Sequence, residues 1–298
     1  MKIGEKIKKL RTEKSMTQSE LAGNFITRNM LSLIESGSAQ PSLTTIEYIA
    51  NRLNVPAGIL ISDNEDEYFY RRTSQIQNVR RAYAAGDHRI CLDLCNKLSD
   101  DVNDDELLLI RAECYLGIAK EEFLKGQLKS AVLTFDKAFE ISSKTVYNTS
   151  HIEAEAAVYC LYMRSLSPLL HADCIDSSIP LGLSENDPFC RYARIAMTID
   201  EQGKSSADIA EDYLASCADN DVYIGHIRAL YCMINNNHQK ALEIILGLIN
   251  GEKTIPSPLM YAFFRDLEIC CRETGDFKGA YEYAGAKVVT LERLLLDS

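Results

Sequence analysis

The feature that most constrains the fold is a run of short, capped helical segments at the start of the chain. Residues 2–14 place isoleucine and leucine at helical spacing with lysines on the other face, which predicts an amphipathic helix. Residues 17–20, Thr-Gln-Ser-Glu, form a capping box that begins a second helix. Thr27 caps a third helix over residues 28–35, and Gly37 is placed to end it.

A fourth helix is predicted to open at Pro41 and Ser42, and a short fifth turn of helix covers residues 55–60. The expected buried stripe of the fourth helix is Leu43, Ile46, Ile49, Ala50 and Leu53. Five short helices in 62 residues, with a tight turn between the second and third, form the arrangement that places one exposed helix in a DNA major groove. We therefore predict a DNA-binding domain over residues 1–62.

The segment TQSELAGNFITRNMLSLIESGSAQPSLTTIEYIANRLNVP, residues 17–56, carries a resemblance to a known family. Its T-Q-x-E-L-A, I-E-S-G and P-S-L elements resemble the helix-turn-helix domain of the phage-repressor, or Xre, family, and the likeness covers residues 3–61. One departure is expected: the usual glycine between the second and third helices is absent, and residues 25–27 form a shorter link, similar to the link of peptide-pheromone regulators.

The resemblance implies a set of DNA contacts. They fall on Gln18, Thr27, Arg28, Asn29, Ser32, Ser36, Ser38 and Ser42. Gln18 would contact a phosphate or brace a base-reading side chain, Arg28 can pair with guanine and Asn29 with adenine, and the last three serines would hold phosphates. The resemblance also implies a structural salt bridge between Arg11 and Glu35. Taken singly, the threonines and serines are equally consistent with ordinary helix caps.

From residue 64 onward the chain shows helix-length amphipathic segments separated by recurring turns. The turns begin at Gly86, Gly126, Gly203, Asn236 and Gly275, which are 40, 77, 33 and 39 residues apart. This period predicts a solenoid of about six helical hairpins over residues 63–298, with an irregular hairpin between His151 and Leu183. The fold class is therefore all-α: a five-helix helix-turn-helix domain followed by a right-handed α-solenoid.

The clearest repeat resembles a tetratricopeptide unit. Its packing positions are Tyr115, Ile118 and Ala119 on the first helix and Ala131, Phe135 and Ala138 on the second. First helices line the concave side of such an array, where extended peptides bind. The candidate peptide-binding residues are Arg80, Tyr83, Lys120, Tyr159, Tyr162, Arg194, Tyr223, His226, Arg265 and Arg272. The alternative is that many of these tyrosines simply pack between repeats.

Charge and cysteine content limit the possible functions. The net charge is −11, but residues 1–62 hold eight Lys or Arg against five Glu, which leaves +3 there and −14 in the rest of the chain. An acidic second domain need not touch DNA, and the small positive surplus predicts weak binding by a monomer. The ten cysteines lack metal-ligand spacing and fall at apolar helical positions, so we expect core packing, no metal and no cofactor.

A helix-turn-helix domain followed by tetratricopeptide-like repeats resembles the peptide-responsive regulators of the Rgg, PlcR and PrgX group. The resemblance implies a cytoplasmic homodimer, with no membrane segment, that binds a double-stranded DNA operator and is controlled by a short signalling peptide. Two alternatives stay open: an adaptor that holds a partner protein, and a phosphatase-like modulator of a partner. No nucleophile–base grouping, phosphate-binding glycine loop or metal spacing supports an enzyme.

Overall fold

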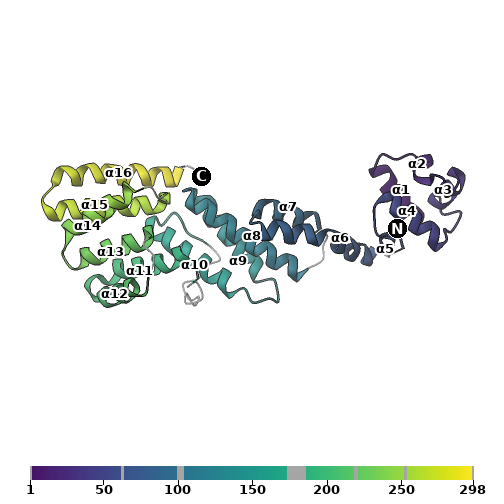
Figure 1. The fold of residues 1–298 in the computed structure, drawn as a ribbon. Coiled ribbons are helices and arrows are strands. Elements are labelled where there is room, and N and C mark those ends of the chain that lie inside the picture. Colours follow the sequence, from purple (N-terminus) through teal and green to yellow (C-terminus); the bar gives the residue numbers. More distant parts are fainter. Residues whose placement is uncertain are drawn as a thin grey trace. The chain divides into compact units, whose positions relative to one another are not determined.

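A computed structural model describes residues 2–61, 64–98, 104–172, 186–217, 221–251 and 254–296 (Figure 1). All regular structure in these ranges is helical. The chain divides into two compact units, Met1–Val102 and Asn103–Ser298. The first predicted hairpin, which follows the five N-terminal helices, belongs by its contacts to the first unit.

The first unit contains the five predicted N-terminal helices and one hairpin. Its helices are α1 (Ile3–Glu13), α2 (Gln18–Ala22), α3 (Arg28–Glu35), α4 (Leu43–Leu53), α5 (Ala57–Ile61), α6 (Asn64–Ala84) and α7 (His88–Leu98). The caps explain where α2 and α3 begin. Glu20 N donates to Thr17 Oγ1 at 3.2 Å while Thr17 N donates to Glu20 Oε2 at 2.6 Å, so the predicted capping box is confirmed. Thr27 Oγ1 accepts from Met30 N at 3.1 Å and caps α3.

The apolar faces of α1 to α5 meet in one small core. Its fully buried side chains include Ile7, Leu21 and Leu31. The prediction for Leu43 is wrong, because Leu43 is the first residue of α4 and its side chain is 61% exposed. A residue in the first turn lies at the edge of the helix–helix contact, so the buried stripe begins one turn later. The expected absence of a glycine between α2 and α3 is also wrong: Gly23 ends α2 with φ 55°, a backbone conformation that suits glycine.

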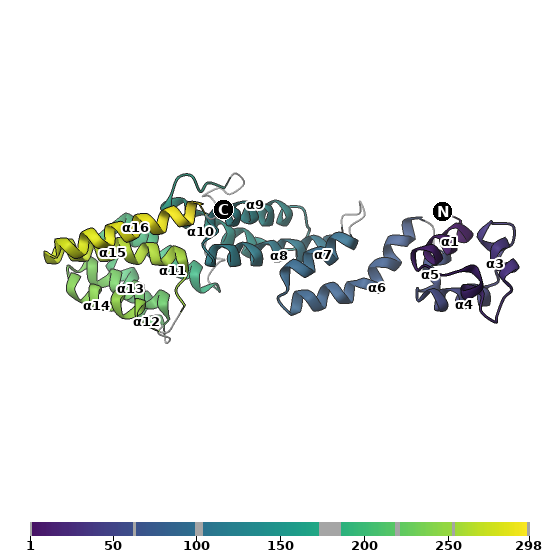
Figure 2. The same ribbon diagram turned by 90° about the horizontal axis from the view of Figure 1, so that it is seen from above.

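The second unit is an array of stacked helices (Figures 1 and 2). Its α-helices are α8 (Asp105–Leu124), α9 (Leu128–Ser142), α10 (Ser150–Leu166), α11 (Pro188–Gln202), α12 (Ala207–Ser216), α13 (Val222–Ile234), α14 (His238–Ile249), α15 (Ser257–Thr274) and α16 (Phe277–Leu296). A 3₁₀ turn, η2 (Gly203–Ser206), joins α11 to α12. The hairpins are α8–α9, α11–α12, α13–α14 and α15–α16. In the predicted irregular hairpin, α10 supplies the first helix, and residues 173–185 lie outside the described ranges.

Every predicted turn has the backbone that a tight helix–helix connection needs. The positive φ values are 75° at Gly86, 83° at Gly126, 55° at Gly203, 57° at Asn236 and 84° at Gly275. Glycine and asparagine adopt this left-handed conformation most readily, which is why these residue types mark the turns.

The core of the second unit has the packing that the repeat pattern predicts. Ala131, Phe135 and Ala138 are fully buried where α8 and α9 cross, and small residues there let the two helices approach closely. Of the nine cysteines in the described ranges, eight are buried and all are free thiols, in agreement with a core-packing role. Among described residues, no group of His, Cys, Asp or Glu side chains is arranged to hold a metal ion. No helix in that part of the chain is long and apolar enough to span a membrane.

Candidate functional site

Helix α3 presents a polar surface on one side and packs on the core with the other. Leu31 and Ile34 are buried, whereas Arg28, Asn29 and Ser32 are exposed. Within the described ranges, the side chains of Arg28 and Asn29 make no hydrogen bond or ion pair. A guanidinium and a carboxamide are therefore available on the N-terminal half of an exposed helix. These are the two groups that bind guanine and adenine edges through paired hydrogen bonds.

Thr27, Ser36, Ser38 and Ser42, four more of the predicted DNA-contacting residues, are exposed and make local hydrogen bonds at helix ends. Ser36 Oγ donates to Leu33 O at 3.0 Å and lies 2.9 Å from Ser38 Oγ, next to the end of α3. Ser42 Oγ accepts from Thr45 N at 3.2 Å at the start of α4. The structure therefore shows the capping role of Thr27 and Ser42. Their exposure leaves room for a phosphate beside the positive end of each helix.

A three-residue polar cluster fixes the position of α3 against α1 and α2. Arg11 Nε and Nη2 donate to Glu35 Oε1 at 2.6 Å and Oε2 at 3.0 Å, which confirms the predicted salt bridge. Gln18 Nε2 donates to the same Oε2 at 2.9 Å, so Gln18 is bound to Glu35 in the free protein. Burial opposes ionisation of Glu35, but the hydrogen bonds from Arg11 and Gln18 outweigh it and hold the pKa of Glu35 below its ordinary value.

Helix α3 is the third of the five N-terminal helices, is braced by Glu35 and presents an exposed polar face. This arrangement defines a DNA-binding regulator of the helix-turn-helix class. The helix-turn-helix family model matches residues 7–60. The cryptic phage CTXphi transcriptional repressor RstR of Vibrio cholerae is 32% identical over 78 residues, which are 26% of this chain and 70% of RstR. The chain therefore belongs to the helix-turn-helix family of the Xre type, a family of transcription regulators rather than of enzymes.

Three solved structures align with nearly the whole chain. PlcR of Bacillus thuringiensis, in complex with the peptide PapR7 and DNA, is 16% identical and covers 99% of both chains with a TM-score of 0.23. A mutant of PrgX is 13% identical, covers 95% of this chain and 100% of its own, and has a TM-score of 0.32. ComR of S. thermophilus, in complex with DNA and its signalling peptide ComS, is 16% identical over 97% and 99% of the two chains, with a TM-score of 0.23. Because all three TM-scores are below 0.5, no functional statement about this chain follows from them.

The predicted peptide-binding residues fall into separate places. Arg80 and Tyr83 are exposed on α6 in the first unit. Arg272 is exposed near the end of α15, with Nε 4.0 Å from a carboxylate oxygen of Glu273. The other seven lie on α8, α10, α11, α13 and α15 of the second unit: Lys120, Tyr159, Tyr162, Arg194, Tyr223, His226 and Arg265.

Lys120 belongs to an ion cluster that ties α8 to α10 and to the start of α11. Its Nζ lies 2.5 Å from Glu155 Oε2 and 2.7 Å from Asp187 Oδ2. The buried Tyr159 hydroxyl donates to Asp187 Oδ1 at 3.4 Å. Burial opposes ionisation of Asp187, but Lys120 outweighs it and lowers the pKa of that carboxyl group. The ammonium of Lys120 is thus already paired twice.

A second chain of polar groups runs from α11 through α13 to α15. Tyr192 Oη lies 2.8 Å from His226 Nδ1, and His226 Nε2 lies 2.8 Å from Asp266 Oδ2. Asp266 Oδ1 accepts from Arg265 Nε at 2.8 Å. Burial opposes ionisation of Asp266, but the charge of Arg265 and the His226 hydrogen bond prevail, so the pKa of Asp266 is lowered. An ionised carboxylate only accepts, so His226 Nε2 donates and, in a neutral ring, Nδ1 accepts from Tyr192.

The guanidinium of Arg265 ends this chain at a second carboxylate. Nη1 donates to Asp200 Oδ2 at 2.8 Å and Nη2 to Asp200 Oδ1 at 3.2 Å. The helical pattern of the sequence predicts His226 and Arg265 as peptide-binding residues, but it predicts neither Tyr192 nor Asp266. Both sit at core positions of helical patterns, and no local motif marks a buried polar chain that crosses three helices.

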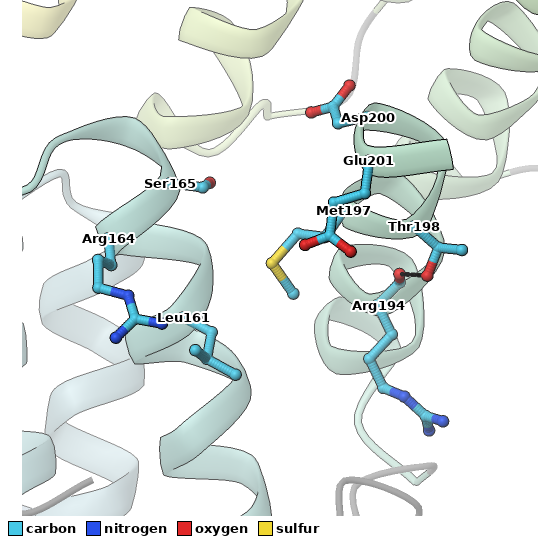
Figure 3. Close-up of a pocket in the computed structure, with 8 residues that line it drawn as sticks. All are labelled: Leu161, Arg164, Ser165, Arg194, Met197, Thr198, Asp200 and Glu201. Atoms are coloured by element: carbon cyan, nitrogen blue, oxygen red, sulfur yellow. Dashed lines mark hydrogen bonds between the residues drawn. The ribbon is translucent and has the colours of Figure 1, made fainter. Parts of the chain in front are cut away.

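Two adjoining cavities lie beside this chain. The larger cavity, of about 400 Å³, lies between α10 and α11 and is called here the α10–α11 groove. In Figure 3, Leu161, Arg164 and Ser165 come from one wall, and Arg194, Met197 and Glu201 from the other. The smaller, of about 140 Å³, is called here the Arg265 chamber and is lined by Tyr162, Tyr192, Tyr261 and Arg265 among others. Ser165, Met197 and Asp200 line both cavities, so the two adjoin each other at these residues.

Proposed function

We propose that the chain is a transcription regulator that binds a duplex operator as a homodimer and is controlled by a short peptide in the α10–α11 groove. The observation that carries the DNA part is that the Arg28 guanidinium and the Asn29 carboxamide, on a braced and exposed helix, have no hydrogen-bond or ion-pair partner among the described residues. Arg28 would then bind guanine and Asn29 adenine, while Ser36, Ser38 and Ser42 would fix the register on phosphates. Because DNA is the target, we place the protein in the cytoplasm.

The charge of the helix-turn-helix region, residues 1–62, supports binding as a dimer. A formal surplus of +3 in residues 1–62 provides few phosphate contacts, so one copy gains little from counterion release. Two copies related by a two-fold axis double the contacts and read half-sites about 34 Å apart, or a multiple of that distance. Dimerisation thus supplies DNA affinity that the small positive charge of one copy does not provide.

The form and lining of the groove support a peptide ligand. Leu161 and Met197 offer apolar area, while Arg164 and Glu201 offer charges of both signs. A peptide has alternating polar backbone and variable side chains, which suits such mixed walls. Control of DNA binding then follows from linkage: the peptide binds one arrangement of the helices more tightly and shifts the population toward it.

A mobility-shift assay on the DNA that flanks the protein's own gene tests this function. The full chain is titrated with and without an extract that contains secreted peptides. We expect a retarded complex whose apparent affinity changes with the extract. A complex that forms equally with and without peptide would support DNA binding but contradict peptide control, and the absence of any complex at low salt would contradict the DNA part.

A further inference from the structure

We infer that the Arg265 chamber is a carboxylate-binding subsite, in which a carboxylate of the ligand replaces Asp200 on the guanidinium of Arg265. This inference rests on the proposed peptide-binding role of the α10–α11 groove. It adds the chemical class of the group that is recognised. It also assigns Asp200 as an internal competitor that occupies the subsite when no ligand is bound.

The guanidinium already holds a carboxylate in the geometry that the subsite needs. Both Asp200 oxygens face Arg265, at 2.8 Å from Nη1 and 3.2 Å from Nη2. This paired arrangement is the one in which arginine binds carboxylates most strongly. A ligand carboxylate therefore needs no rearrangement of Arg265, only the departure of Asp200.

The other edge of Arg265 is fixed by groups that stay in place. Arg265 Nε donates to Asp266, which is 1% exposed and also accepts from His226. His226 in turn is bound to the buried Tyr192 hydroxyl. These three side chains span α11, α13 and α15, so they hold the guanidinium in a constant orientation. His226 is thus a positioning residue rather than a ligand contact.

Asp200 is the partner that can leave. Its side chain is 46% exposed, against 1% for Asp266. It lies near the end of α11, where Figure 3 shows it at the upper edge of the groove. An ion pair with an exposed partner contributes little to stability, because water solvates the released carboxylate well. Release of Asp200 therefore costs little, whereas release of Asp266 would leave a buried charge unpaired.

The hydroxyl of Tyr162 supplies an independent sign of a missing ligand. Tyr162 is 4% exposed, lines the chamber, and its oxygen makes no hydrogen bond of acceptable geometry within the described ranges. Burial raises the pKa of this hydroxyl, and a weak hydrogen-bonding interaction with the Tyr192 hydroxyl partly opposes the shift. The Tyr192 oxygen is itself bound to His226. A buried hydroxyl without a well-formed hydrogen bond among the described residues is unfavourable, so an acceptor oxygen placed in the chamber would gain a hydrogen bond from Tyr162.

The carboxylate can be the ligand's terminus or the side chain of Asp or Glu, and four peptide pools separate these sources. The pools are fluorescently labelled randomised pentapeptides, with free or amidated carboxyl termini, each made with and without Asp and Glu. Binding to the full chain is measured by fluorescence polarisation. We expect the free-acid pools or the pools with Asp and Glu to bind, and the amidated pool without acidic residues to bind at least about five-fold more weakly.

Asp200→Asn tests the competitor role, Asp212→Asn is its matched control, and Tyr162→Phe tests the donor role of the Tyr162 hydroxyl. Asp200→Asn removes the competing charge, and we expect roughly five-fold tighter binding of the carboxylate-bearing pools. Asp212→Asn removes the same charge from an exposed residue of α12 that lines neither cavity, and we expect no change in binding. Tyr162→Phe keeps the ring and removes the donor, and we expect weaker binding by about five-fold.

The outcomes separate this inference from the proposed function. Equal binding of all four pools, with Asp200→Asn no tighter than the unsubstituted chain, would overturn the subsite and leave peptide binding intact. No binding of any pool by any variant would overturn both. Gains of the same size in Asp200→Asn and Asp212→Asn would show a general charge effect and also overturn the competitor role.

Discussion

Glu35 holds three helices of the DNA-binding unit together, so its replacement by Gln gives a demanding test. The substitution keeps the shape of the side chain and removes the charge that faces Arg11. Arg11 and Glu35 are 11% and 3% exposed, which places this pair nearer to a buried than to a surface salt bridge. Removing one partner of a fully buried pair costs about 3–5 kcal/mol, and Arg11 keeps its 2.8 Å hydrogen bond to Met16 O. We therefore expect Glu35→Gln to lower the free energy of unfolding of this unit by about 2–3 kcal/mol.

Hydrogen exchange of the full chain, measured by mass spectrometry on fragments from residues 1–61, reports the opening free energy of this unit separately from the rest. A matched control is the double variant Arg11→Met with Glu35→Leu, which replaces the pair with apolar groups of similar volume. Its loss should be smaller than that of Glu35→Gln, because no charge is left unpaired. A change in the opening free energy below about 0.5 kcal/mol for Glu35→Gln, or a larger loss in the double variant, would show that the Arg11–Glu35 pair does not stabilise this unit as expected.

Three further predictions follow from individual contacts. Arg28→Ala should reduce sequence preference by about 1–3 kcal/mol in competition mobility shifts, whereas an equal loss on all duplexes would assign Arg28 to phosphate. Gly126→Ala should lower the melting temperature of the second unit more than Gly275→Ala does. Both glycines have positive φ, but of the two only Gly126 has neighbours that a new Cβ would meet, with Leu294 Cδ2 at 3.0 Å. Equal decreases in melting temperature for the two variants would contradict this. Asp187 and Asp266 have pKa values below the ordinary 3.8, so their stabilisation is complete above that value and lost as the pH falls through the lowered values. Circular dichroism between pH 7 and pH 2 checks this, and unchanged helicity of Asp187→Asn and the parent across the range would count against it.

The order of the helices in the first unit was predictable because the determinants are local. Thr17, Thr27 and Gly37 act within a few residues of their own position, so caps and stops can be identified without knowledge of the tertiary structure. The misplacement of Leu43 has the opposite origin. Periodicity predicts the direction of a side chain on its helix. It does not predict where the neighbouring helix ends, and the end of that neighbour decides whether a first-turn residue is buried.

The ligand site was less predictable because its residues are joined across helices. Arg265 and His226 were selected from helix position alone, but their partners Asp200 and Asp266 are fixed by packing between α11, α13 and α15. The same limit explains Lys120, which was selected as an available cation and is paired with Glu155 and Asp187. A single sequence places charges on helix faces, whereas the pairing of those faces depends on how the hairpins stack.

Selection of bound duplexes from a randomised DNA pool is the most direct test of sequence reading by helix α3. The full chain is compared with the double variant Arg28→Ala and Asn29→Ala at one salt concentration, since the affinity of any protein for DNA changes with salt. We expect the full chain to enrich one motif as a repeated half-site and the double variant to bind DNA without enriching it. Failure of the full chain to enrich any motif, or the same motif from both proteins, would contradict sequence reading by helix α3.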